Sequence, residues 1–317
     1  MNKEFEKLCR MSQKQLKNHV KQRLQNANKE VITEDGYVFA KGTFPVLLVA
    51  HLDTVHKKLP SIIEYDLTQD IISSPNGIGG DDRCGVYMIF KILKKFNCSV
   101  LFCEDEEIGC EGSRKFADSA FARGLDFNYI IEFDRAHAND AVFYQCANSD
   151  FEKFITKEFY KTAYGSFTDI CEVAPAIGCA AVNLSCGYYA AHTTSEYVVL
   201  SEMEKSIEAA CAILARTTEN DKFEYIEKAY QYSKYYNYVN NYPYSYSYEN
   251  EEDDIDDLFC EKYYIIEYTD NNGITNWFDT IAYSREEAIG KFAMEFSNIP
   301  FDNVSDIMVD REMAQYM

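Results

Sequence analysis

Four short apolar segments constrain the fold of this chain more than any other feature. They cover residues 46–50, 99–103, 129–133 and 181–184, and each is largely apolar and partly β-branched. A strand that is buried on both faces has this continuous pattern, whereas a half-exposed strand alternates. Amphipathic helical patterns at residues 82–96 and 202–216 fit between and after these segments. The sequence therefore predicts an α/β fold with a mostly parallel, mixed sheet that is covered by helices on both faces.

Outside these strand and helix segments, the first 220 residues contain simpler local patterns. Apolar residues at helical spacing predict a helix over residues 3–25, and Asp35-Gly36 predicts a hairpin turn after it. The motif SEME at residues 201–204 is a capping box and predicts the start of the last helix of the sheet domain.

The chain is long enough for one sizeable core and a small second module, with 317 residues and a hydrophobic content of 47%. Its composition changes near residue 222, where a tyrosine-rich stretch begins and an acidic run follows. We therefore predict a main domain over residues 1–221, a linker over residues 222–258 and a small α+β module over residues 259–317. The module is expected to have ββαβ order, with a hairpin turn at Asn272-Gly273, a helix from Ser284 and a last strand at residues 306–309.

The charge balance excludes two classes of partner. Lys and Arg total 31 against 52 Asp and Glu, which gives a formal net charge of -21. A surface this acidic repels phosphate backbones and anionic lipids. Neither nucleic acid nor a membrane is therefore expected as a partner. The N-terminal sequence is charged throughout, and no apolar run approaches the roughly 20 residues of a membrane span. The eleven cysteines lack the spacing of a disulfide scaffold, so we expect reduced thiols and a cytoplasmic location.

Polar residues with metal-binding side chains follow each predicted strand. In an open α/β sheet the site lies outside the carboxyl ends of the strands, so these residues are expected to converge on one crevice. Histidines mixed with carboxylates suit zinc, cobalt or manganese better than calcium. The residues are His51 and Asp53 after the first strand, Glu106 and Glu107 after the second, Asp134 after the third, His192 after the fourth, and Asp81 and Asp82 in the glycine-rich loop PNGIGGDDRCG.

The short spacings within these groups also have a chemical meaning. Residues two apart on a strand project to the same side, so Asp53 can accept a hydrogen bond from the ring nitrogen of His51 that faces away from a metal ion. The adjacent Glu106 and Glu107 cannot both point the same way in an extended chain. One of them is therefore free to bind metal while the other moves a proton to or from water.

These segments together resemble a known superfamily. HLDTV, GIGGDDRCGV, EDEEIGCEGS, a strand ending in Asp134, and AAHTTSEYVV are similar, in this order, to the ligand-bearing segments of the di-zinc exopeptidase superfamily. That superfamily includes peptidase T, the carboxypeptidase G group, bacterial aminopeptidases and N-acyl amino acid deacylases. The resemblance spans residues 46–200 and implies a zinc-exopeptidase-like fold. The intervals between the segments are too short for the lid or dimerisation domain that many members insert.

The resemblance also implies a role for each matched residue. His51 and Asp134 would complete one metal site, Glu107 and His192 the other, and Asp81 would bridge the two ions. Glu106 would be the general base and later the general acid, and Asp53 would orient His51. The implied cofactors are two divalent ions, zinc first, with cobalt or manganese as alternatives.

Three functions are compatible with this pattern of residues. The first is a metal-dependent, aminopeptidase-like exopeptidase that hydrolyses short peptides with a metal-activated water. The second is a deacylase that acts on N-acyl amino acids or small amides by the same chemistry. The third is an inactive binding protein that keeps the fold and recruits a protein partner through its C-terminal module.

Several polar residues near these segments are not expected to bind metal. His19, His56 and His137 are interpreted as ordinary structural or surface histidines, and Asp82 and Arg83 as a brace for the helix start. Arg135 and Glu196 lie beside the proposed ligands. We expect Arg135 either to narrow the cleft or to form a salt bridge near it, and Glu196 to help anchor the histidine loop.

Overall fold

The computed structural model divides into two compact units, Met1–Tyr230 and Gln231–Met317. It describes residues 2–165, 167–228, 262–270, 275–282, 288–289, 291–292, 296 and 303–310. None of the helices in these parts of the chain has the length and apolar content that a membrane span needs.

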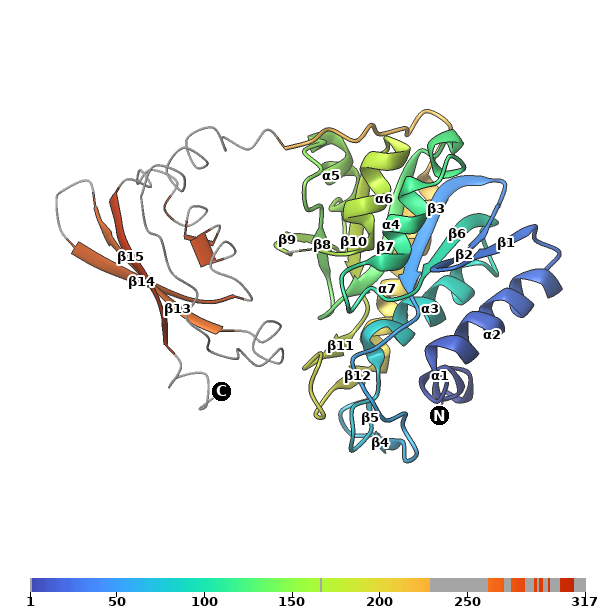
Figure 1. Ribbon diagram of the computed structural model, residues 1–317, viewed down its shortest axis with the longest axis horizontal. Coiled ribbons are helices and arrows are strands. Elements are labelled where there is room, and N and C mark those ends of the chain that lie inside the picture. Colours follow the sequence, from blue (N-terminus) through green and yellow to red (C-terminus); the bar gives the residue numbers. More distant parts are fainter. Residues whose placement is uncertain are drawn as a thin grey trace. The chain divides into compact units, whose positions relative to one another are not determined.

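The first unit is built on an eight-stranded sheet with the order β1-β2-β6-β3-β7-β10-β8-β9 (Figure 1). Its four central strands are parallel and coincide with the four predicted apolar segments. They are β6 (Cys98–Cys103), β3 (Phe44–His51), β7 (Tyr129–Arg135) and β10 (Ala181–Ser185). The prediction of a mostly parallel central sheet is therefore confirmed.

Antiparallel strands close the sheet on both sides, which makes it mixed. On one side the hairpin of β1 (Val31–Glu34) and β2 (Tyr37–Ala40) pairs with β6, and its turn is the predicted Asp35-Gly36. On the other side β8 (Asp140–Val142) runs antiparallel to β10, and β9 (Lys161–Ala163) is parallel to β8.

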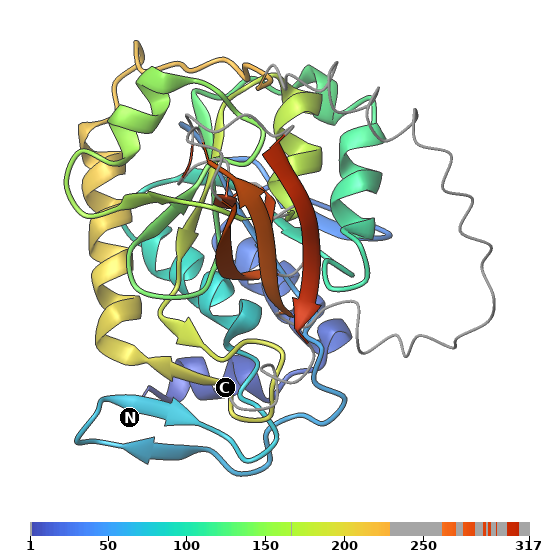
Figure 2. The ribbon, with the colours of Figure 1, turned by 90° about the vertical axis from the view of Figure 1, so that its left-hand side faces the viewer.

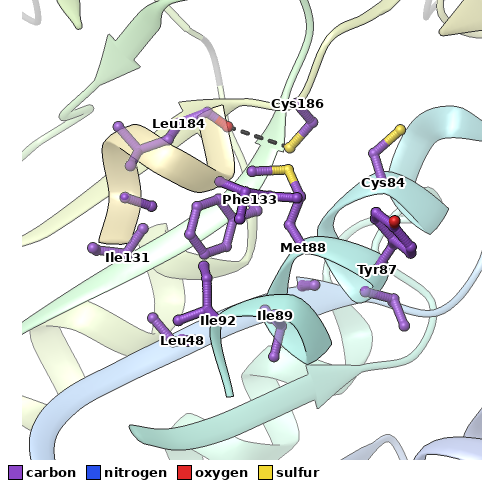
Figure 3. Close-up of a cluster of buried hydrophobic side chains, with 14 of the residues drawn as sticks. Leu48, Cys84, Tyr87, Met88, Ile89, Ile92, Ile131, Phe133, Leu184 and Cys186 are labelled. Carbon is purple, nitrogen blue, oxygen red and sulfur yellow. Dashed lines mark hydrogen bonds between the residues drawn. The ribbon is translucent and has the colours of Figure 1, made fainter. Parts of the chain in front are cut away.

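Helices cover both faces of this sheet, as predicted. Successive residues of β3 belong to different buried clusters: Leu48 faces the cluster that contains α3 (Gly80–Ile92) and α7 (Leu200–Arg216), whereas Val49 faces α4 (Glu111–Asp118) and α6 (Asp169–Ile177). Figure 3 shows the first cluster, in which Met88, Ile89 and Ile92 of α3 pack on side chains from the strands. The α1 (Lys3–Cys9), α2 (Gln13–Asn26) and α5 (Ser149–Ile155) helices add to the first cluster, and the short helix η1 (Ala122–Gly124) adds to the second.

A second, four-stranded sheet brings two distant loops together. Its order is β11-β12-β5-β4, formed by β4 (Glu64–Asp66), β5 (Ile71–Ser73), β11 (Tyr188–Tyr189) and β12 (Tyr197–Val199). β4 and β5 form the light blue hairpin at the lower left of Figure 2. In the chain between β3 and α3, all of which the structure describes, this hairpin is the only regular structure, so no lid domain is inserted there.

Two local predictions were wrong. The helix expected over residues 3–25 is two helices, because Ser12 forms a capping box with Gln15 and starts a new helix after a break. The SEME capping box does not form either. α7 begins earlier, after Val199, and the backbone N–H of Ser201 donates instead to the carboxylate of Asp70 (2.7 Å).

The first unit extends past the predicted domain end at residue 221. Phe223 exchanges backbone hydrogen bonds with Asn128 and Ala180, and Tyr225 and Ile226 bond to Gly178 and Ala147. The Phe223 ring also lies 5.2 Å from the rings of Phe151 and Phe154. The first residues assigned to the linker are therefore part of this unit, and the rest of the predicted linker lies outside the described residues.

The second unit contains a three-stranded antiparallel sheet with the order β14-β13-β15. Its strands are β13 (Lys262–Thr269), β14 (Thr275–Ala282) and β15 (Val304–Asp310), so the predicted hairpin and last strand are confirmed. Tyr264, Ile266 and Tyr268 form a separate core with Ala288 and Phe292. The turn residues 271–274 and the predicted helix start at Ser284 lie outside the described residues.

Candidate metal centre

Two groups of histidine and carboxylate side chains meet at the carboxyl edge of the parallel strands. The first consists of His51, Asp81 and Asp134, and the second of Asp81, Glu107 and His192. Within each group, one ligand atom per residue lies within 4.8 Å of the others. The five residues predicted to bind metal therefore lie together, although they come from separate strands and loops.

The first group is built on strand ends. His51 is the last residue of β3 and is fully buried, and its Nε2 lies 2.9 Å from Asp81 Oδ1 and 3.3 Å from Asp134 Oδ1. Its Nδ1 lies 3.1 Å from Asp53 Oδ1, which fixes the tautomer that leaves Nε2 for a metal ion.

The second group is built on loops. His192 follows β11, has a left-handed backbone conformation (φ 63°), and places its Nε2 3.2 Å from Asp81 Oδ2 and 3.1 Å from Glu107 Oε2. The other carboxylate oxygen of Glu107 is buried and has no hydrogen-bond partner in the described chain.

The spacing of these atoms fits divalent cations. Two ligands of one zinc ion, each about 2 Å from it, lie roughly 3.3 Å apart in a tetrahedral site. The observed contacts of 2.9–3.3 Å match this separation, and the two oxygens of Asp81 face different histidines. The unpartnered oxygen of Glu107 is a further atom that could bind a metal ion. The residues therefore fit a pair of ions that share Asp81.

The electrostatics of the two groups favour positive charge. Burial opposes ionisation of His192, but its contacts with Asp81 and Glu107 outweigh burial and raise its pKa to about 11. Burial, with the nearby Asp81 carboxylate, raises the pKa of Glu107 to about 7. For Asp81, burial is outweighed by the contacts with His192 and His51, so its pKa is lowered. So dense a cluster of buried carboxylates needs cationic partners, and divalent ions satisfy that need.

Glu106 lies beside both groups without belonging to either. Burial, together with the nearby carboxylates of Asp134, Asp169 and Glu107, raises its pKa well above the usual range. The thiol of Cys110 donates a hydrogen bond to Glu106 Oε1 (3.5 Å). Glu107 thus belongs to a ligand group and Glu106 does not, and the proton-transfer role of Glu106 stays a prediction.

Asp53 has a wider structural role than the sequence indicates. Besides contacting His51, its Oδ1 accepts the backbone N–H of Glu106 (3.1 Å) and its Oδ2 accepts that of Glu107 (3.0 Å). One carboxylate therefore orients a histidine of the first group and the loop that carries Glu106 and Glu107.

Several contacts that hold Asp134 were not predicted from the sequence. The Thr168 hydroxyl donates to Asp134 Oδ2 (2.9 Å), the Asn183 side chain accepts the Asp134 N–H (2.9 Å), and the Tyr188 hydroxyl donates to the Asp134 carbonyl (3.0 Å). Asn183 had a detectable signal, because it is an amide within an otherwise apolar strand. Thr168 and Tyr188 had none.

The neighbouring charged residues have supporting positions. As predicted, Asp82 accepts the Gly85 N–H and braces the start of α3, and it also accepts the His51 N–H. The buried guanidinium of Arg83 donates to the carbonyls of Leu52 and Asp53.

Arg135 forms a salt bridge, which is one of its two predicted roles. Its guanidinium contacts Asp140, and His137 contacts the same carboxylate.

Comparisons with known proteins give a match to a peptidase family over part of the chain. Residues 38–175 match the model of peptidase family M28. No curated protein matches the sequence.

Solved structures with similar folds include two aminopeptidases and a tripeptidase. Aminopeptidase PepT from Bacillus cereus is 14% identical, with a TM-score of 0.55 over 67% of this chain and 96% of that one. A tripeptidase from Staphylococcus aureus is 12% identical, with a TM-score of 0.53 over 67% and 97%. An aminopeptidase from the archaeon Desulfurococcus kamchatkensis is 15% identical, with a TM-score of 0.52 over 68% and 94%.

The family match and the similar folds point to the same class of protein. Residues 38–175 are similar to peptidase family M28, and the fold of the first unit is similar to the folds of solved aminopeptidases. At the level of the family, the match is to peptidases.

Proposed function

We propose that this protein is a metal-dependent exopeptidase of the aminopeptidase type that acts on short peptides. The observation that carries the proposal is the sharing of Asp81 between two histidine–carboxylate groups, with Glu106 beside them. The names of the similar structures, two aminopeptidases and a tripeptidase, support peptides as the substrate class.

The ligand types support two divalent ions. We assign His51 and Asp134 to one, Glu107 and His192 to the other, and Asp81 to both. Imidazole with carboxylate suits zinc, cobalt or manganese, and the family match favours zinc. When bound, such ions would polarise the substrate carbonyl and acidify the attacking water.

The side chains of the protein then supply the proton transfers. Glu106 accepts a proton from the attacking water as the new C–O bond forms, and it delivers that proton to the amide nitrogen as the C–N bond breaks. The products are an amine and a carboxylate. Asp53 holds the His51 ring and the backbone of Glu106 at a fixed separation, because its carboxylate contacts both.

The acidic surroundings favour a substrate with a free amino terminus. The carboxylates of the site and the net charge of -21 both attract a cationic group to this edge of the sheet. An N-acylated substrate lacks that charge. This difference places the aminopeptidase ahead of the deacylase.

An assay with matched substrates tests the proposal. The full chain, supplied in turn with Zn²⁺, Co²⁺ and Mn²⁺, is incubated with unblocked dipeptides and tripeptides, with their N-acetylated forms and with N-acetyl amino acids. We expect release of the first residue from the unblocked peptides. Hydrolysis confined to N-acyl amino acids would instead establish the deacylase, and no bound metal and no hydrolysis would favour the binding protein.

A further inference from the structure

Glu196 and His56 form a buried pair that is separate from the proposed ligands. Glu196 contacts the loop that carries Asp81, the aspartate shared by the two groups. We propose that Glu196 and His56 act as positioning residues that hold Asp81 in place and thereby set the affinity for both cations. The inference rests on the proposed two-cation site. Neither residue contacts the reacting atoms, so their effect is exerted through Asp81.

Glu196 binds the backbone on both sides of Gly80. Its carboxylate is fully buried; Oε2 accepts the N–H of Gly79 (2.7 Å) and Oε1 accepts the N–H of Asp81 (3.0 Å). The backbone approaches so closely here that a Cβ atom on Gly80 would lie 2.8 Å from Val198 and 3.3 Å from Glu196 Oε1. The backbone of Asp81 is therefore fixed by direct hydrogen bonding to one carboxylate.

His56 completes the pair. Its Nε2 lies 2.6 Å from Glu196 Oε2, and its side chain is only 8% exposed. The ring packs on Gly77, where any Cβ atom would lie 2.1 Å from His56 Cε1. The N–H of Gly77 in turn donates to the carbonyl of Thr194 (3.1 Å). Three loops are thereby joined around one carboxylate: residues 52–56, 77–81 and 192–196.

The consequence for metal binding follows from the sharing of Asp81. A displaced ligand that serves one ion weakens one site, whereas a displaced Asp81 weakens both. Loss of a residue that orients a metal ligand typically lowers metal affinity by about 10- to 100-fold. A buried carboxylate that loses a donor is also poorly satisfied and moves.

Matched variants distinguish the loss of a hydrogen bond from the loss of side-chain volume. His56→Gln keeps an N–H donor near the position of Nε2, whereas His56→Ala removes it. Glu196→Gln places an NH₂ group against backbone N–H donors. Glu202→Gln is the control. Glu202 accepts a hydrogen bond from Tyr189 (2.6 Å), which lies just before the loop of residues 192–196, and its side chain does not bond to the described residues 77–81.

Calorimetric titration with Zn²⁺ on the full chain tests the proposal. We expect Glu196→Gln and His56→Ala to weaken both binding events by about 10- to 100-fold, and His56→Gln and Glu202→Gln to leave them near wild type. With Co²⁺, the visible absorption bands should change in the two weakened variants, because the bands report coordination rather than stability. Thermal unfolding without metal checks that each variant is folded.

Each outcome decides the matter. Wild-type affinity and spectra in Glu196→Gln and His56→Ala would overturn the inference, as would equal losses in His56→Gln and His56→Ala. If Glu196→Gln fails to fold, the two His56 variants still carry the test. A wild-type protein that binds two ions but cleaves no peptide would remove the proposed function and leave this inference standing, whereas one that binds no metal would overturn both.

Discussion

The two halves of the proposed metal centre differ in how they are built. His51 and Asp134 lie at the ends of β3 and β7, in the middle of the parallel sheet, and the His51 side chain is 1% exposed. His192 and Glu107 lie on loops, and the His192 side chain is 33% exposed. In the part of the chain that the structure describes, a carboxylate contacts the second ring nitrogen of His51 but not that of His192.

This difference indicates that one half is preorganised and the other is adjustable. Ligands on strands, with a partner on the second ring nitrogen, are held near their binding geometry before an ion arrives. Ligands on loops must be ordered when the ion binds, which costs conformational entropy. We therefore expect the half with His51 and Asp134 to bind its ion more tightly. Asp81 belongs to both halves and couples them.

The largest effect is expected from removing the residue that the two halves share. Asp81→Ala should lower turnover by at least about a thousandfold and lower the metal content from two ions towards none, because both sites lose a ligand. Metal analysis after gel filtration and a peptide assay measure this. Asp140→Asn, a carboxylate outside both groups, is the control. Retention of two ions in Asp81→Ala would break the proposed link between the halves.

Glu106→Gln should lower turnover by about 100- to 10,000-fold while both halves keep their metal, because proton transfer is lost but no ligand is. The same two measurements apply, with wild type as the reference. Loss of metal in this variant would mean that Glu106 is a ligand and that the roles of Glu106 and Glu107 have been misassigned.

The asymmetry itself is tested by removing one histidine at a time. Calorimetric Zn²⁺ titration of His192→Ala should leave the tighter binding event, and titration of His51→Ala should leave the weaker one. We expect the remaining dissociation constants to differ by about 10-fold or more, since the orienting contact from Asp53 serves only His51. The reverse order would contradict the interpretation of the two halves.

Asp53→Asn should have a smaller effect that is concentrated on the first half. The asparagine has only one acceptor oxygen for contacts that now use two, so we expect about 10- to 100-fold weaker binding at the site of His51. The second binding event should weaken less. An equal loss at both sites would show that the Glu107 backbone contact matters as much as the His51 contact.

Truncation should change the metal centre least. A chain ending at residue 230 should fold and bind metal as the full chain does, because every proposed ligand lies in the first unit. A chain ending at residue 221 loses the aromatic contacts of Phe223, and its free energy of unfolding should fall by about 3–5 kcal/mol. Chemical denaturation of the two truncated chains measures the difference. Equal stability would return the domain boundary to residue 221.

The sequence predicts the first half of the centre better than its supports. His51, Asp134 and the strands that carry them have strong signals, because a continuous apolar run indicates a buried strand and the ligand-type residue falls at its carboxyl end. The contacts of Thr168 and Tyr188 with Asp134 join residues that are far apart in the sequence, and only the tertiary fold brings them together. The contact of Cys110 with Glu106 lies within one turn of the chain, and no sequence motif identified it. The contact of His56 with Glu196 also depends on the tertiary fold, and it agrees with the interpretation of His56 as a structural histidine.

Two local signals were overridden by competing contacts. The SEME motif has the residues of a capping box, but the pairing of β12 with β5 brings Asp70 close to the Ser201 N–H, and the helix starts earlier. At the N-terminus the apolar spacing continues through residues 10–12, and the helix still breaks there because Ser12 and Gln15 cap a second helix. In both places the polar contact, and not the apolar period, decides the boundary.

A crystal structure of the zinc-loaded full chain, with anomalous diffraction measured at the zinc edge, would locate the ions directly. We expect two strong peaks, one among His51, Asp81 and Asp134 and the other among Asp81, Glu107 and His192. A single peak that Asp81 does not touch, or zinc bound only elsewhere on the chain, would contradict a two-ion centre built on a shared aspartate.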